Sequence, residues 1–213
     1  MLRTPALAAS LVSLVLAVGA CGSASKSKTS AQPTSTAPPS SVTSQKSTPS
    51  VGPAAPEVNA AGDIPDNQAF IAYAAPSGGF NVKVPEGWAR TESAGVVTFT
   101  DKFNSIRIQA QPAPAAPTVA SATQGEVPAI RSDAANYRPG TVTMVNRSAG
   151  PAVLITYQAD SAPDPVTTKV LSLDVERYEL WRNRNEVVLT LSAPHGADNV
   201  DPWKTVTNSF AWQ

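Results

Sequence analysis

The amino-acid composition changes abruptly near residue 60, and this change limits the part of the chain that can fold. Of the 35 residues 22–56, 21 are Ser, Thr or Pro, and only two are aliphatic residues larger than alanine. So little apolar surface cannot offset the entropy that is lost when a backbone is ordered. We therefore predict a disordered Ser/Thr/Pro-rich tether over residues 21–62 and a single folded domain over residues 63–213.

Residues 1–20 have the parts of a secretory signal peptide. Arg3 provides a basic start, residues 7–18 are mostly apolar, and small residues follow. The apolar run is shorter than the ~20 residues that a helix needs to cross a membrane. We therefore predict that residues 1–20 direct secretion and are then removed.

The signal peptide ends at the only cysteine of the chain. Val18-Gly19-Ala20-Cys21 resembles the bacterial lipobox, in which signal peptidase cuts before the cysteine and diacylglycerol alkylates its thiol. We predict cleavage between Ala20 and Cys21 and a lipid anchor on Cys21; an ordinary signal peptide that is cut nearby is the alternative. Each buried CH₂ of an acyl chain such as palmitate contributes roughly 0.8 kcal/mol, so two or three chains hold a domain on a membrane. The predicted location is the outer face of the cytoplasmic membrane, in the cell envelope.

Charge and cysteine content exclude several classes of protein. From residue 61 onward the chain has 12 basic and 15 acidic side chains, whereas a general nucleic-acid surface needs an excess of basic ones. With its only cysteine acylated, the mature domain has no thiol for a disulfide, so its stability must come from an apolar core. We expect no nucleic-acid partner. These features do not indicate an oligomeric state.

Apolar and polar residues alternate over much of the domain, which is typical of antiparallel strands. The predicted strands are residues 70–73, 80–84, 95–100, 105–111, 141–147, 151–158, 166–181 and 186–193. In the longest of them, Leu173 and Val175 alternate with Asp174 and Glu176. We therefore expect a sheet with one apolar face on the core and one face in solvent.

Two helices are predicted. Between residues 118 and 137, apolar side chains recur every three or four positions, with Thr118 as the N-cap. Pro128 lies inside this segment and is expected to kink or split it, because proline lacks the N–H donor. Near the C-terminus, Asp201 and Pro202 are predicted to be the N-cap and the first residue of a short helix that packs on the sheet.

The order of these features resembles the Mog1/PsbP-like fold. The resemblance depends on the segment 79–88, which ends in Pro85-Glu86-Gly87-Trp88, on Val97-Thr98-Phe99, and on the segment from Trp203 to Phe210. With the lipobox and the tether, the chain resembles the LpqN-type lipoproteins of mycobacteria and related actinobacteria. The resemblance implies an α/β (α+β) sandwich, with a central antiparallel sheet flanked by helices, and an adaptor or accessory role in the cell envelope and its lipid assembly. It carries over no binding residue.

Side chains suited to catalysis are scarce. His195 is the only histidine, Asp198 is too close in sequence to be assumed to orient its ring, and no Gly-x-Ser-x-Gly element is present. Glycoside hydrolysis needs a pair of carboxylates, which any two of Asp174, Glu176 and Glu179 would supply. Asp174 and Glu176 share one face of a strand, and a solvated outer face accounts for them better. The sequence has one histidine and no Asp-rich loop with the spacing that calcium requires, so it does not predict a metal site. We predict no catalytic residue, no metal and no cofactor.

Four residues are candidates for ligand binding: Tyr137, Arg177, Trp181 and Arg182. Arginines hold phosphates, sugar hydroxyls or carboxylates, and aromatic rings stack on sugars. The alternative is a charged hairpin end that protects a sheet edge and is neutralised by neighbouring glutamates.

Two functional hypotheses follow. The one we favour is a non-enzymatic lipoprotein that binds envelope lipids, including glycolipids, or a membrane-protein partner, through an open sheet or a groove beside the helix at 118–137. It predicts an apolar cleft without convergent titratable groups. The alternative is an envelope hydrolase that acts on lipid esters or glycans, and it predicts His195 or a carboxylate pair in the main pocket.

Overall fold

The computed structural model describes residues 62–76 and 79–213 of the 213-residue chain. These residues fall within one contact unit, Gly52–Gln213. The predicted signal peptide, the lipobox and nearly all of the tether lie outside the described residues. Within the described ranges, no helix is long and apolar enough to cross a membrane.

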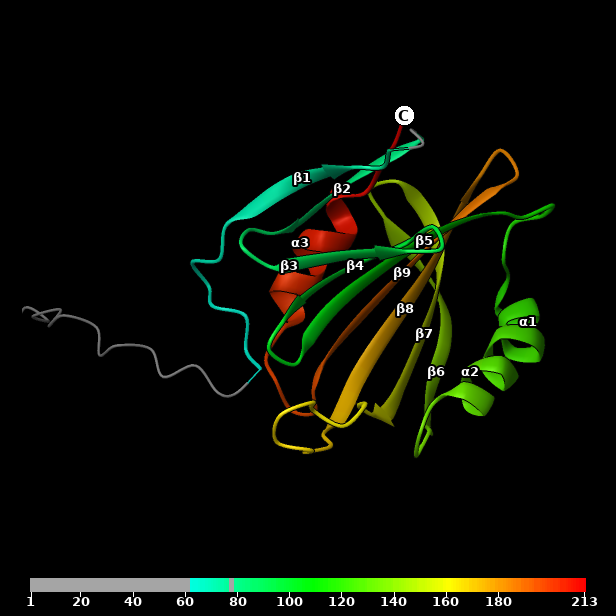
Figure 1. Cartoon of the computed structure of the whole chain (residues 1–213). Coiled ribbons are helices and arrows are strands. Elements are labelled where there is room, and N and C mark those ends of the chain that lie inside the picture. The colour runs from blue at the N-terminus through cyan, green and yellow to red at the C-terminus, as the bar shows by residue number, and fades with distance from the viewer. Residues whose placement is uncertain (1–61, 77–78) are drawn as a thin grey trace, which may run out of the picture. The chain divides into compact units, whose positions relative to one another are not determined.

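Two antiparallel sheets make up most of the described structure (Figure 1). The larger sheet has seven strands in the order β3-β4-β5-β9-β8-β7-β6, namely β3 (Ala89–Ser93), β4 (Val96–Asp101), β5 (Asn104–Pro112), β9 (Asn185–Pro194), β8 (Ser172–Arg182), β7 (Gly150–Asp160) and β6 (Arg138–Arg147). The smaller sheet has the order β1-β2-β10, namely β1 (Phe70–Ala74), β2 (Phe80–Pro85) and β10 (Ala211–Trp212). The pairing of β5 with β9 joins the two halves of the larger sheet.

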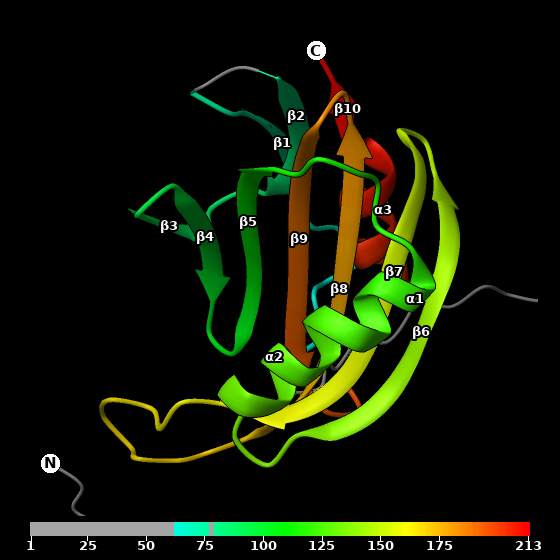
Figure 2. The same cartoon turned by 90° about the vertical axis from the view of Figure 1, so that its right-hand side faces the viewer.

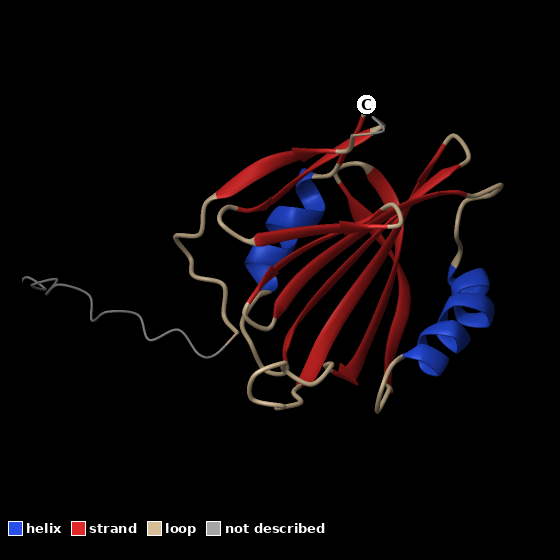
Figure 3. Ribbon diagram, in the orientation of Figure 1, coloured by secondary structure: helices blue, strands red, loops and turns tan. Residues whose placement is uncertain are grey.

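Helices lie on both faces of the larger sheet (Figures 1 and 3). On one face, α3 (Val200–Ser209) lies between the larger and the smaller sheet. On the other, α1 (Val119–Ser121), the π-helical turn η1 (Ala122–Glu126) and α2 (Val127–Asp133) follow one another without a gap; we call them together the α1–α2 segment. Figure 2 shows this segment crossing in front of the larger sheet. The arrangement confirms the predicted fold class, although strands predominate.

The main core lies between the larger sheet and α3. Val206, Phe210 and Ile106 are each at most 1% exposed, and the Phe210 ring stacks on Phe80 with 5.3 Å between the ring centroids. Trp203 belongs to the same apolar cluster. Each fully buried Ile, Leu or Phe side chain contributes ~1.5–3 kcal/mol to folding. The apolar side of the last helix therefore packs on the sheet, as predicted.

The face under the α1–α2 segment has a much smaller apolar cluster. Its buried members are Ala122, Val153 and Ile155. Arg177 and Glu179 of β8 lie on this same face, where Arg177 reaches a carboxylate of η1. This side of the sheet is therefore held by few apolar contacts and contains charged groups.

Most of the predicted strands are confirmed within a few residues at each end. The periodicity misses β3, because all of its side chains are exposed and none alternates with a buried one. The predicted strand 166–181 is wrong at its start, since β8 begins at Ser172. Before it, the Asp164 side chain accepts hydrogen bonds from the backbone N–H groups of Val166 at 3.0 Å and Thr167 at 2.7 Å, and so closes a turn.

The first predicted helix is confirmed, with a shorter extent and a different interruption. Thr118 is the N-cap, and its side chain accepts a hydrogen bond from the first turn. In η1 the Val127 N–H donates to the carbonyl of Ala122, five residues earlier, instead of four. This π turn directly precedes Pro128, which has no N–H to donate. The segment ends at Asp133.

The last helix begins earlier than predicted. Its N-cap is Asn199 rather than Asp201, and its first residue is Val200 rather than Pro202. The Asn199 side chain is buried and does not cap the helix; its Oδ1 accepts from the Ile64 N–H at 2.7 Å, and its Nδ2 donates to another asparagine and a carbonyl. These partners are distant in sequence, so no local pattern reveals the true start of the helix.

The prediction of a solvated face on β8 is wrong. Tyr178 and Leu180 share a face with Asp174 and Glu176, and both belong to the main core. On the opposite face, Glu179 is only 2% exposed. Because helices cover both sides of the larger sheet, the alternation along β8 separates two packed faces and not a core from solvent.

Candidate functional site

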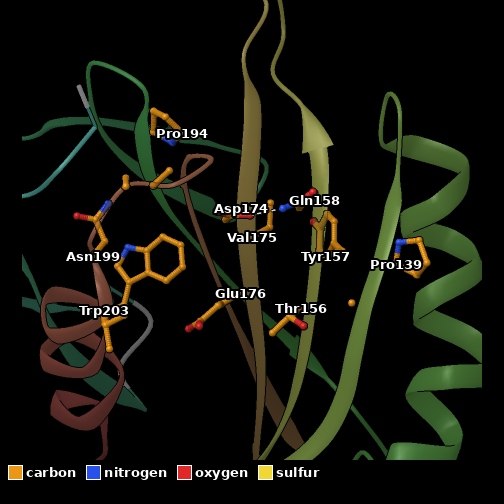
Figure 4. A pocket seen from close by; sticks show the side chains of 14 residues that line it. Pro139, Thr156, Tyr157, Gln158, Asp174, Val175, Glu176, Pro194, Asn199 and Trp203 are labelled. Carbon is orange, nitrogen blue, oxygen red and sulfur yellow. Dashed lines mark hydrogen bonds between the residues drawn. The ribbon is translucent and has the colours of Figure 1, made fainter. Parts of the chain in front are cut away.

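A cleft of about 520 Å³ lies between α3 and the strands β7 and β8 (Figure 4). Trp203 and Val200 of α3, together with Pro194 from the end of β9, form an apolar wall. β7 and β8 supply a polar wall, and the start of β6 closes the far side. The cleft therefore joins an apolar surface to a row of hydrogen-bonding groups, which is the usual composition of a small-molecule site.

The polar wall consists of two cross-strand pairs. Thr156 stands opposite Glu176, and Gln158 stands opposite Asp174, in the register of β7 with β8. The Gln158 Nε2 donates to Asp174 Oδ1 at 2.8 Å. Residues two apart on a strand point to the same side, so the pairing of β7 with β8 directs all four side chains toward the cleft.

Asp174 is bound to the loop that follows β9. Its Oδ2 lies 2.9 Å from Nδ1 of His195 and accepts from the Gly196 N–H at 3.2 Å. Partial burial raises the pKa of Asp174, but hydrogen bonds from Gln158, His195 and Gly196 outweigh it, so the pKa lies below its ordinary value. Asp174 is therefore a charged acceptor at neutral pH.

Glu176 is held by a second chain of contacts that extends into the core. The Tyr178 Oη donates to Glu176 Oε2 at 2.6 Å and accepts from Nη2 of Arg147 at 2.8 Å. Burial, followed by the hydrogen bond and charge of Glu176, raises the pKa of Tyr178 to about 12. Tyr178 therefore keeps its proton and remains a donor to Glu176, whose side chain lines the cleft (Figure 4).

Gly140 allows the start of β6 to close over the cleft. A Cβ at this position would lie 2.4 Å from the carbonyl oxygen of Thr156, which no real side chain can do. A register shift between Pro139 and Val142 accompanies this close approach. The close contact brings Pro139 and Gly140 to the rim of the cleft.

His195 lies in the loop between β9 and α3, and its partner is one that the sequence does not predict. Its partner is Asp174 of β8 and not the neighbouring Asp198, whose backbone N–H donates to Asp63. In residues 62–76 and 79–213, the His195 ring forms its hydrogen bonds through Nδ1, with Asp174 and Gln158, and no hydroxyl or thiol is hydrogen-bonded to Nε2. The geometry thus contains the base and the orienting carboxylate of a hydrolytic triad without a nucleophile.

The register of the β8–β9 hairpin is the signal that could have found this pair. Asp174 pairs with Ala193 across the hairpin, so His195, two residues later, lies at the same end of the sheet. The tight connection between β8 and β9 is visible in the sequence, and counting back from it gives this register. The cleft is also not the apolar one expected for the favoured hypothesis, because Asp174 and Glu176 both line it.

The four candidate binding residues do not line the α3 cleft. Arg177 faces the α1–α2 segment, and its Nη2 lies 2.7 Å from Glu126 Oε2. The Trp181 Nε1 donates to the carbonyl of Ala113 at 3.0 Å. The two others lie apart from these: Arg182 ends β8 at the hairpin turn, and the Tyr137 ring lies 5.6 Å from the ring of Tyr157. The structure does not gather them into one site, and their role in binding stays a prediction.

A second cavity of about 520 Å³ lies on the opposite face, beside the α1–α2 segment. Arg107, Gln109 and Arg177 from the sheet and Glu126 and Ile130 from the segment contribute to its lining. A groove beside this helix is what the favoured hypothesis expects. Its floor is polar and not apolar.

No protein-family model matches the sequence, and no curated protein matches it. Among solved structures, the chain is similar to cyanobacterial PsbP (CyanoP) from Synechocystis sp. PCC 6803, with a TM-score of 0.50 and 15% identity over 73% of this chain and 99% of that one. It is also similar to the Ran-binding protein Mog1p of Saccharomyces cerevisiae, with a TM-score of 0.47 and 9% identity over 68% and 95% of the two chains. A protein from Bacteroides thetaiotaomicron matches with a TM-score of 0.46 and 12% identity over 67% of this chain and only 48% of its own length.

The likeness to CyanoP concerns the fold alone, because the identity is low. It shows that the domain has the Mog1/PsbP-like fold that the sequence predicts. The resemblance to LpqN-type lipoproteins is a finer statement that depends on the residues of the N-terminal region, and it belongs to the proposal below.

Proposed function

We propose that this protein is a lipid-anchored, non-enzymatic binding module of the cell envelope, similar to the LpqN-type lipoproteins. In this proposal Cys21 carries the anchor on the outer face of the cytoplasmic membrane. The α3 cleft then binds part of an envelope lipid, such as the polar group of a glycolipid, or a side chain of a membrane-protein partner. The observation that carries the proposal is the cleft itself, in which Trp203 and Pro194 face the acceptors Asp174 and Glu176.

The chemistry of the cleft suits recognition. Trp203, Val200 and Pro194 offer surface for the apolar side of a sugar ring or an acyl chain, while carboxylate oxygens accept hydrogen bonds from hydroxyl groups. Asp174 is ionised at neutral pH, so it serves as an acceptor and not as a general acid. The cleft thus combines an apolar surface with a charged hydrogen-bond acceptor, which is a suitable composition for binding a hydroxylated ligand.

A photocrosslinking experiment tests this proposal in the native lipoprotein. A photoreactive amino acid is placed at Val200, which lines the cleft and is 59% exposed, and in a control at Val119, which is 38% exposed on the opposite side of the sheet. We expect envelope lipids or one membrane protein to be captured from position 200 and not from position 119. Capture of neither, or equal capture at both positions, contradicts the proposal.

The anchor is tested separately from the cleft. Cys21→Ser removes the thiol that the lipid would occupy, so we expect the protein to leave the membrane fraction and to lose incorporation of an alkyne-labelled fatty acid. Ser23→Ala is the matched control and should keep both. A wild-type protein that incorporates no fatty acid would show that the lipobox is not used.

An envelope hydrolase is the second candidate, and the Asp174–His195 pair favours it. His195 does not itself line the cleft, but its Nδ1 contacts Asp174, one of two carboxylates that do. Hydrolysis of lipid esters or glycosides by the purified protein, lost in His195→Ala and retained in Asp198→Asn, would establish this function. Absence of activity from the unsubstituted protein removes this alternative.

A further inference from the structure

The α1–α2 segment is weakly packed for an element that covers a sheet. Among its residues only Ala122 is buried, whereas α3 buries Trp203, Val206 and Thr207. The segment is also interrupted by the π turn η1. Elements with few buried apolar contacts open at low free energy, and π turns are frequent at functional positions.

One ion pair joins the segment to the floor of the groove. The Nη2 of Arg177 lies 2.7 Å from Oε2 of Glu126 in η1. The Arg177 side chain is 15% exposed and that of Glu126 is 42% exposed, so only the arginine end of this pair is shielded from solvent. The position of the segment on the sheet therefore depends on the availability of the Arg177 guanidinium.

The same guanidinium has a second, competing partner. Its Nε lies 3.4 Å from Oε1 of Glu179, whose side chain is 2% exposed. Glu126 of the segment and Glu179 of the sheet thus contact different nitrogens of one guanidinium, Nη2 and Nε. A fully buried carboxylate with a single long ion pair is costly when it is charged.

The charged and titratable groups around Glu179 come from every neighbouring element. Those that act on Glu179 are Arg177 of β8, Glu126 of η1 and Glu186 of β9; Arg107 of β5, Asp133 of α2 and Tyr157 of β7 line the adjacent cavity with Arg177. Glu186 accepts from Gln111 at 2.7 Å, and Arg107 donates to Gln109 at 2.9 Å. Burial, aided by the charges of Glu126 and Glu186 and opposed by Arg177, raises the pKa of Glu179 to about 7.

We propose that the α1–α2 segment is a lid, closed over the groove when Glu179 is protonated and released when Glu179 is ionised. When Glu179 is neutral, Arg177 forms an ion pair with Glu126 alone, and this ion pair keeps the lid closed. When Glu179 is charged, it repels the carboxylate of Glu126 and forms an ion pair with the same guanidinium. The charged Glu179 also becomes hydrated when the lid opens, which favours the open state. Arg107 and Gln109, which already line the cavity beside the lid, would become more accessible on opening.

The sign of the pH effect follows from the direction of the shift. The closed lid binds the Glu179 proton more tightly than the open lid, in which the pKa returns toward the ordinary value of 4.5. Closure is therefore complete below that value and weakens as the pH rises to about 7. Within this window the ratio of open to closed lid rises by up to ~10-fold per pH unit, since one proton is released on opening.

Amide hydrogen exchange of the full chain tests the lid. We expect the protection factors of amides in residues 122–133, corrected for the intrinsic pH dependence of exchange, to fall ~10-fold or more between pH 5 and pH 7.5. Amides of α3 should not change. In Glu179→Gln, which keeps the shape and removes the charge, the lid should stay closed at both pH values.

Two further variants keep the outcome decisive. Glu186→Gln removes a neighbouring acid that does not contact Arg177, so the pH dependence should persist. Glu126→Gln removes the ion pair, so protection of the lid should fall even at pH 5. Protection that does not vary with pH in the unsubstituted chain, an unchanged slope in Glu179→Gln, or full protection at pH 5 in Glu126→Gln overturns the proposal.

Discussion

The α3 face of the larger sheet buries Val206 and Phe210 among aliphatic and aromatic side chains, whereas the opposite face buries Glu179 beside Arg177. The first face gains free energy from each apolar side chain that leaves water. The second gains little from the small cluster around Ala122 and must also desolvate a carboxylate. One sheet therefore has a face that supplies stability and a face whose cover is easily displaced.

The two cavities differ in the same way. The α3 cleft is built on the well-packed face, so Trp203 and the β7–β8 pairs hold their positions before any ligand arrives. The cavity beside the α1–α2 segment is bounded by an element with one buried residue. A preformed site and a gated one are thus expected on opposite faces of the same sheet.

Phe210→Ala should have the largest effect on stability. Phe210 is 1% exposed and stacks on Phe80, so its truncation leaves a cavity and should lower the free energy of unfolding by ~3–5 kcal/mol. Urea denaturation measures this loss. Ile130→Ala, on the partly buried side of α2, is the comparison and should cost far less; equal losses would show that both faces stabilise the domain alike.

Glu179→Gln should have an intermediate effect that depends on pH. Because the pKa of Glu179 is raised to about 7, the folded protein loses stability as the pH rises from 4.5 to about 7. The glutamine variant should therefore be more stable than the unsubstituted chain at pH 8, by ~1–3 kcal/mol, and closely matched at pH 4. Thermal or urea unfolding at the two pH values checks this, and a variant that is less stable at pH 8 would show that the charge is favourable.

Thr118→Ala should have the smallest effect, confined to the weakly packed face. The Thr118 Oγ1 accepts a hydrogen bond from the Ser121 N–H at 3.0 Å, and loss of such a cap costs ~0.5–2 kcal/mol of helix stability. We expect faster hydrogen exchange in residues 119–126 and little change in global unfolding. A large drop in global stability would mean that the segment unfolds together with the main core.

The sequence predicts a strand wherever buried and more exposed side chains alternate along it. Strands β2, β4, β5 and β9 have this alternation, whereas β3 does not, because pairing with β4 alone holds it in place. The N-cap Thr118 is a local signal and was predicted. The cap at Asn199 was not, since its side chain is bound by residues far away in the sequence.

The candidate site was less accessible. Asp174 and His195 come together only through the β8–β9 register, and the Asp174–Gln158 contact needs the β7–β8 register as well. The solvated face predicted for Asp174 and Glu176 and the unforeseen burial of Glu179 have one cause, because an alternating pattern does not reveal that helices cover both sides of a sheet. The α1–α2 segment, which lies over the face of Glu179, is separated from β8 in the sequence by the strands β6 and β7.

The sequence by itself predicts a location and the limits of the folded domain, because a resemblance to a lipobox and a Ser/Thr/Pro-rich composition depend only on neighbouring residues. It also determined the fold class, since strand and helix periodicity reflect which side chains leave water. Only the tertiary structure decided which carboxylates meet a histidine, a tyrosine or an arginine. Those contacts depend on strand register and on what covers each face, and both are set by the packing of distant segments.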